Sequence, residues 1–130
     1  MKRIIILTFP LLLTATVLSA TADIYDEISV AIRAGSSQEV AKYINGNIDL
    51  TILTQENVYS KAQAELIIKD FFKKNTPKTF NIIHRGTSKD GAMYAIGNLT
   101  TTSGVVFRTY FFIKQSSGKY FIQELRFEKE

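Results

Sequence analysis

The chain of 130 residues contains no cysteine and a single histidine, His84. Without cysteine it forms neither disulfide bonds nor thiolate metal sites, so its stability has to come from a packed core. No local cluster of Asp, Glu or further His residues accompanies His84, which argues against a zinc site. We therefore expect neither a bound metal nor another cofactor.

An excess of charge of one sign is also missing. With Lys2 and Arg3 of the apolar N-terminal segment set aside, 14 basic residues stand against 12 acidic ones, a net charge of +2. This balance gives no electrostatic footprint for nucleic acid. The chain also lacks a Gly-x-Ser-x-Gly nucleophile elbow and a Gly-rich phosphate loop, so no catalytic signature is present.

The first 22 residues have the layout of a secretory signal peptide. A short basic start precedes the apolar run Ile4–Leu13, and a small-residue exit ends at Ala22. The alternative is an uncleaved membrane anchor, but the apolar run is shorter than the ~20 residues that span a bilayer. We expect cleavage after Ala22, a periplasmic or secreted protein with no membrane span, and one domain over residues 23–130.

Helical periodicity marks three segments of the mature chain. Apolar residues at helical spacing predict a helix over Asp23–Ala34, and Ser36 caps a second, short helix. The clearest signal is the capping box formed by Ser60 and Gln63, in which each side chain bonds the other residue's backbone amide. It predicts a long helix over Lys61–Asn75.

Alternation of apolar and polar residues predicts the strands. One lies at residues 48–52, after the second helix. Four more follow the long helix, and short turns between them impose an antiparallel meander. These four strands cover residues 79–85, 92–101, 105–115 and 119–128.

The strand at Val105–Gln115 is apolar on both faces, although a sheet with one solvated face normally alternates with polar residues. The stripe of the long helix covers only part of such a sheet. Two interpretations remain open. Either the shorter helices cover the rest, or the second face meets another subunit or a ligand.

The order of elements resembles the nuclear-transport-factor-two-like superfamily, and the chain resembles an uncharacterised family of secreted Bacteroidetes domains of unknown function. The residues that carry this resemblance are Tyr59–Glu65 with Phe71 and Phe72, His84–Gly86, Tyr94–Leu99 and Leu125–Glu128. The resemblance implies an α+β cone, in which a curved antiparallel sheet of four to five strands wraps one long helix, with two short N-terminal helices. The superfamily holds isomerases, dehydratases and non-catalytic modules, so the fold does not decide the function.

His84 is one candidate ligand-binding residue. By strand alternation it shares a face with Phe80 and Ile82. It is either an acid or base in a pocket, because imidazole titrates near neutral pH, or a partly buried side chain bonded to a carbonyl or carboxylate.

Arg108, Tyr110, Glu124 and Arg126 form the second candidate group, on the last two strands. They face one another if the turn at residues 116–118 is a three-residue loop, whereas a two-residue loop shifts the register and separates them. Together they are either a clamp for a carboxylate or phosphate or a surface ladder of ion pairs.

These patterns favour an exported, non-catalytic domain that binds a small apolar or amphipathic ligand, forms a homodimer through its sheet, or does both. The alternative is an isomerase or dehydratase that uses His84 as acid or base and Tyr94 or Tyr110 as hydrogen-bond donor. The enzyme hypothesis predicts that His84 points into the cone.

Overall fold

The computed structural model describes residues 23–88 and 90–130, so the predicted signal peptide and its cleavage lie outside the described residues. Within these ranges no helix has the length and apolar character needed to cross a membrane. The helices are α1 (Ile24–Arg33), α2 (Ser37–Ala41) and α3 (Lys61–Lys74). The strands are β1 (Asn47–Ile52), β2 (Gln55–Ser60), β3 (Pro77–Thr87), β4 (Met93–Thr101), β5 (Val106–Ser116) and β6 (Lys119–Lys129).

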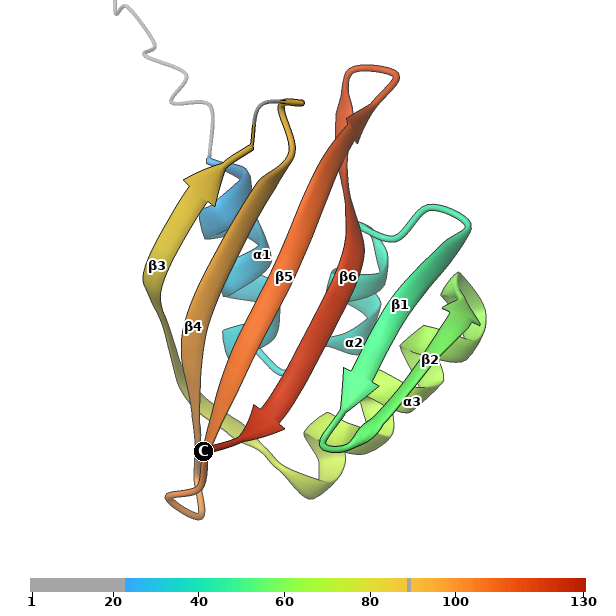
Figure 1. Cartoon of the computed structure of the whole chain (residues 1–130). Helices are drawn as coiled ribbons and strands as arrows, with labels where there is room; N and C mark the ends of the chain where they lie inside the picture. The colour runs from blue at the N-terminus through green and yellow to red at the C-terminus, as the bar shows by residue number, and fades with distance from the viewer. Residues whose placement is uncertain (1–22, 89) are drawn as a thin grey trace, which may run out of the picture.

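The six strands form one curved sheet in the order β2-β1-β6-β5-β4-β3 (Figure 1). The antiparallel meander of β3 to β6 confirms the sequence prediction. The predicted count of four to five strands is too low, because β2 carries almost no buried residue and so gives no apolar alternation. A second feature of the sheet was not predicted: β1 pairs in parallel with β6, far away in the sequence.

All three helices lie on the same face of the sheet (Figure 1). α1 packs on β3, while α3 packs on β1, β2 and α2. We expected the sheet to wrap the long helix. Instead, all three helices pack against it on one face. The interpretation that the shorter helices cover the second face is also wrong, since they share the covered face with α3. We call the uncovered side the open face.

Side-chain caps set the helix starts. The predicted capping box is present: the Gln63 amide donates to the Ser60 hydroxyl at 3.3 Å, and the Ser60 amide donates to the Gln63 side chain at 3.2 Å. Ser36 accepts from the amide of Glu39 at the start of α2, as expected. These bonds satisfy backbone amides that the helix leaves without partners.

Aromatic side chains fill the core between the helices and the covered face. Phe71 of α3 stacks on Phe127 of β6, with 4.6 Å between ring centroids, and meets Phe107 of β5 edge to face at 5.1 Å. Phe80 lies over Gly97, where an added Cβ would come within 2.6 Å of its ring. The space over this small residue is therefore filled by an aromatic ring.

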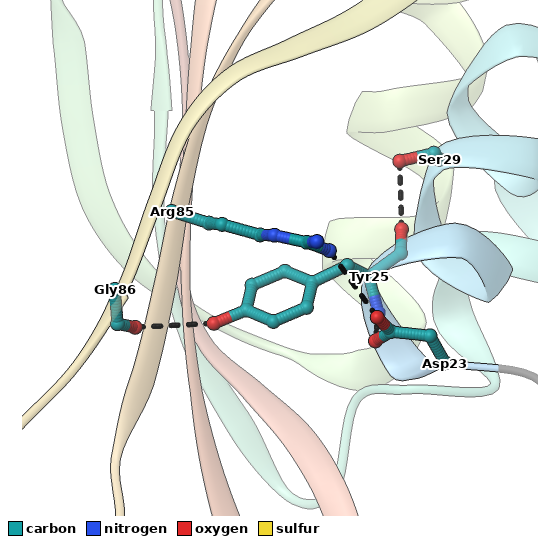
Figure 2. Close-up of polar contacts among 5 residues, drawn as sticks. All are labelled: Asp23, Tyr25, Ser29, Arg85 and Gly86. Carbon is teal, nitrogen blue, oxygen red and sulfur yellow. Dashed lines mark hydrogen bonds and ion pairs between the residues drawn. The ribbon is translucent and has the colours of Figure 1, made fainter.

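The start of α1 is tied to β3 by a polar cluster (Figure 2). Asp23 accepts a hydrogen bond from the Tyr25 amide at 3.0 Å and pairs with the Arg85 guanidinium at 3.2 Å. The Tyr25 hydroxyl donates to the carbonyl of Gly86 at 3.1 Å. The Arg85 guanidinium lies 5.3 Å from the centroid of the Tyr25 ring. This cluster fixes the angle between α1 and the edge strand β3.

Candidate functional site

The open face carries all five residues that the sequence analysis proposed as ligand-binding. On β5, Thr109 and Phe111 are fully buried under the helices, whereas Tyr110 between them projects to the other side and is half-buried. Tyr110 lies opposite Ile96 of β4 and Arg126 of β6. Strand pairing places the others on the same face: His84, Arg108, Glu124 and Arg126.

The β5–β6 hairpin brings its residues together by a route that the sequence did not indicate. The turn has only two residues, Ser117 and Gly118, both at positive φ, and such a loop alone would separate the set. However, the register shifts by one at Gln123, where β6 carries an extra residue. The bulge offsets the short loop, so Tyr110 and Arg126 share a face.

Arg126 is the centre of the contacts on this face. Its Nε and a terminal nitrogen both donate to a carboxylate oxygen of Glu124. Its guanidinium lies 5.2 Å from the centroid of the Tyr110 ring, within cation–π range. Burial works against the charged form of Arg126, but the hydrogen bond and charge of Glu124, together with the charges of Glu128 and Glu56, outweigh it and raise the pKa. Burial, with the charge of Glu124, also raises the pKa of the Tyr110 phenol.

His84 does not lie where alternation predicted. The expectation that it shares a face with Phe80 is wrong, because β3 bulges between Ile82 and His84 and the extra residue turns His84 to the open face. There its Nε2 lies 3.0 Å from the hydroxyl of Tyr94. His84 is exposed and points away from the helix-covered core, contrary to the orientation that the enzyme hypothesis predicts.

Contacts between side chains link these residues across four strands, β3 to β6. Tyr94 connects His84 to Tyr110, whose ring centroid is 6.4 Å from its own. We call this row the polar band, consisting of His84, Tyr94, Tyr110, Arg126 and Glu124. The band is flanked by a shallow hollow of about 170 Å³, which Arg108 and Glu128 line together with Tyr110 and Arg126.

Sequence reasoning missed the residues of β1 that extend the site. Asp49 lies beside Glu124 and Thr51 beside Arg126 in the parallel pairing of β1 with β6. Oδ1 of Asp49 and Oγ1 of Thr51 are buried without a hydrogen-bond partner, and so is Oδ1 of Asn98 on β4. Alternation with Ile48 and Leu50 indicates a polar face on β1. However, no pattern near β1 in the sequence predicts that it pairs with β6.

The polar groups of the open face are able to form hydrogen bonds and ion pairs. It offers neutral phenols, one imidazole, and guanidinium groups that are partly neutralised by carboxylates. Among the residues that the structure describes, no group of three or more His, Asp or Glu side chains is arranged to hold a metal ion. Arg108 lies opposite Glu128 and has no ion pair in residues 23–88 and 90–130, which leaves its guanidinium available to a partner.

Residues 25–128 match the model of a family described as a domain of unknown function, DUF4783. The chain belongs to the DUF4783 family. The match spans nearly all of the described residues, in agreement with the resemblance drawn from the sequence. No curated protein matches the chain.

Solved structures of this family come from Bacteroides. A DUF4783 protein of Bacteroides ovatus is 32% identical with a TM-score of 0.75, covering 80% of this chain and 93% of that chain. One from Bacteroides fragilis is 31% identical with a TM-score of 0.76, covering 83% of this chain and 100% of that chain. The chain therefore shares both family and fold with these proteins.

More distant structures show the fold alone. An NTF-2 like protein of unknown function from Silicibacter pomeroyi is 11% identical with a TM-score of 0.60, covering 82% of this chain and 89% of that chain. This likeness confirms the nuclear-transport-factor-two-like α+β fold. The likeness does not assign an activity to the chain, because proteins of this fold differ in function.

Proposed function

We propose that the chain is an exported, non-catalytic domain that forms a homodimer through the open face of its sheet. The observation that carries this proposal is the placement of all three helices on the other face, which leaves half-buried apolar side chains uncovered. These side chains are Tyr94, Ile96, Val106, Tyr110, Phe112 and Phe121. Partly exposed apolar side chains that gather on one face of a domain support an interaction site there.

Charges on the open face support a second copy as the partner. Arg108 and Lys114 lie on β5, whereas Glu124 and Glu128 lie on the neighbouring β6. A twofold contact presses the same patch of two copies together, so the patch has to complement itself. When β5 of one copy crosses β6 of the other, Arg108 meets carboxylates of the second copy. The carboxylates of β6 favour this arrangement over repulsion, because Arg126 of the same strand is already paired with Glu124.

A small ligand on the same face is the second candidate. The hollow beside Tyr110 is polar, with the guanidinium groups of Arg108 and Arg126, which suits a carboxylate or phosphate group. Its volume of about 170 Å³ is below the ~300–1,000 Å³ of sites that enclose a small molecule. The size of the hollow therefore favours the dimer over an apolar or amphipathic ligand at this position.

The position of His84 favours a binding role over the enzyme alternative. A general acid or base has to reach a substrate in a site that excludes water. His84 and Tyr94 are within hydrogen-bond distance, but His84 is exposed on the edge strand β3. On the covered side of the same strands, Phe80 fills the space over Gly97.

The dimer is tested by the molar mass of the protein in solution, measured by light scattering after expression of the complete chain. We expect a dimer, and we expect Tyr110→Glu to give a monomer with an unchanged circular dichroism spectrum, because the charge would be buried between two sheets. Leu66→Glu is the matched control, since Leu66 is apolar and 66% exposed but lies on α3.

A wild-type monomer at all accessible concentrations would contradict the proposal, and so would loss of the dimer in Leu66→Glu alone.

The intact mass of the same sample tests export. Removal of the signal peptide leaves Asp23 as the first residue, whereas an uncleaved anchor retains residues 1–22.

A further inference from the structure

A groove runs between α1 and the edge strand β3, and His84, the end of the polar band, is one of its lining residues. Its volume is about 710 Å³, within the range of peptide- and ligand-sized sites. Six consecutive residues of β3, Phe80–Arg85, form one side, and residues of α1 including Val30 and Arg33 form the other. Figure 1 shows α1 behind the sheet, beside β3 and behind β4. A groove bounded by a helix and a strand edge is suited to an extended chain.

The outer edge of β3 has no strand beside it, because β3 ends the sheet. A strand edge carries unpaired amides and carbonyls that template another strand. At one end of the groove, a carbonyl of β3 already has a hydrogen-bond donor: the Tyr25 hydroxyl donates to the Gly86 carbonyl (Figure 2). Along Phe80–Arg85, the described part of the chain supplies no equivalent side-chain bond to the backbone.

Exposed apolar side chains stand on both sides of this groove. Val30 of α1 is 52% exposed and Ile83 of β3 is 61% exposed. Ile83 is the extra residue of the β3 bulge, so it is set out of the alternation of its neighbours. An apolar side chain placed between Val30 and Ile83 would remove surface of all three from water.

Charge distinguishes the two ends of the groove. At the Gly86 end, Arg85 is held by Asp23 and by the Tyr25 ring. At the other end Arg33, in the last turn of α1, makes no ion pair within the described residues. A guanidinium without a partner beside an open backbone edge is suited to bind a carboxylate.

We propose that an extended peptide segment adds to β3 as a further strand and lies in the α1–β3 groove. Its backbone bonds the free edge of β3, an apolar side chain packs between Val30 and Ile83, and a carboxylate binds Arg33. Strand addition of this kind derives affinity from main-chain bonds and specificity from side-chain pockets. The bulge at Ile83 interrupts the edge, which limits indiscriminate pairing and leaves selection to the groove. This site goes beyond the proposed dimer and shares His84 with the polar band but not Tyr110, Arg126 or Glu124.

The test is a selection of displayed random peptides of about eight residues, enough to span the groove at ~3.3 Å per residue. The target is the protein expressed as the complete chain. We expect selected peptides to alternate apolar residues and to carry an acidic group. Synthetic versions with a free or an amidated C-terminus show whether the carboxylate comes from a side chain or from the chain end. Binding is measured by fluorescence polarisation.

Two variants locate the site. Ile83→Asp and Arg33→Glu should each weaken binding by roughly tenfold or more, as expected for central contacts of an interface. Leu66→Asp on α3 is the matched control and should bind as the wild type does. Hydrogen exchange should slow along residues 79–84 when the peptide binds, and N-methylation of alternate peptide amides should abolish binding.

Failure to select any peptide would overturn the proposal. So would binding by Ile83→Asp and Arg33→Glu that is as tight as binding by the wild type. Peptide binding that is lost in Tyr110→Glu would place the site on the open face and overturn it as well. The Tyr110→Glu monomer should keep full peptide affinity, so this inference and the proposed dimer fail independently.

Discussion

The two faces of the sheet are built from the same strands but hold different chemistry. Neighbouring residues of β5 show the contrast: Phe111 is fully buried under the helices, while Phe112 on the open face is half-buried and has the ammonium of Lys114 5.8 Å from its ring centroid. The covered face is packed with apolar side chains. The open face mixes aromatic rings with charges that are partly paired.

This difference fits the proposed division of roles, with folding on the covered face and association on the open face. Most apolar side chains on the covered face lose nearly all contact with water when the chain folds, so they supply the hydrophobic driving force. Side chains on the open face keep part of their hydration, and their charges are placed on neighbouring strands. Such a surface contributes less to the stability of one copy and retains free energy for association.

The largest expected effect compares the two neighbouring phenylalanines. Phe111→Ala should lower the free energy of unfolding by about 3–5 kcal/mol, because it leaves a cavity in the core. Phe112→Ala should cost under about 1.5 kcal/mol in the monomeric Tyr110→Glu background, since solvent already reaches the ring. Urea denaturation of both variants measures the difference.

The background variant is the control, because it removes any stabilisation of Phe112 by a second copy. Equal losses from Phe111→Ala and Phe112→Ala would show that the open face is part of the folding core. The contrast between the faces would then be one of composition only.

Local signals in the sequence were sufficient for much of this fold. The capping box at Ser60 and Gln63 predicted α3, because its bonds lie within one turn of the helix. The short turns predicted the meander, since neighbouring strands with brief connections pair antiparallel. These features depend on residues that are close in sequence.

The remaining features depend on partners that are distant in sequence or on an extra residue. β2 was missed because its side chains are mostly exposed, and its pairing to β1 comes from the tight turn at Leu53. Alternation assigned His84 to the wrong face because one bulge reverses the parity of β3. In the last hairpin a bulge at Gln123 offsets a two-residue loop, which kept Tyr110 and Arg126 together. The candidate residues were thus named from the sequence, but the bulges determine the face of the sheet on which they lie.

A smaller effect is expected from alkaline pH, and it should occur on both faces. Burial raises the pKa of Tyr25 on the covered side, partly opposed by Arg85, and burial with Glu124 raises the pKa of Tyr110 on the open face. The folded state therefore binds the phenolic protons more tightly than the unfolded state, whose tyrosines titrate near 10. Stability should be fully present below about pH 10 and should fall as pH rises through the raised pKa values.

Urea denaturation from neutral pH to about pH 11 measures this loss. Tyr25→Phe and Tyr110→Phe should each make the alkaline decline shallower, since each removes one group that has to ionise. Tyr25→Phe should also cost about 1 kcal/mol at neutral pH, because it removes the hydrogen bond to the Gly86 carbonyl. An unchanged alkaline decline in both variants would show that these phenols titrate alike in the folded and unfolded chains.

The smallest expected effect concerns the ion pair at the centre of the polar band. A double-mutant cycle with Glu124→Gln and Arg126→Gln should give a coupling free energy of unfolding of about 1 kcal/mol or less, because the Arg126 side chain is 42% exposed. The Tyr110→Glu background is unsuitable here, because it replaces the ring that Arg126 contacts. The cycle is therefore run by denaturation of the otherwise wild-type protein, at concentrations below the dissociation constant of the dimer. A coupling above about 2 kcal/mol would make the pair a structural element of the fold. If the coupling is small, a clear shift of the dimer dissociation constant in the same variants would assign Arg126 and Glu124 to recognition, the role that we propose for the open face.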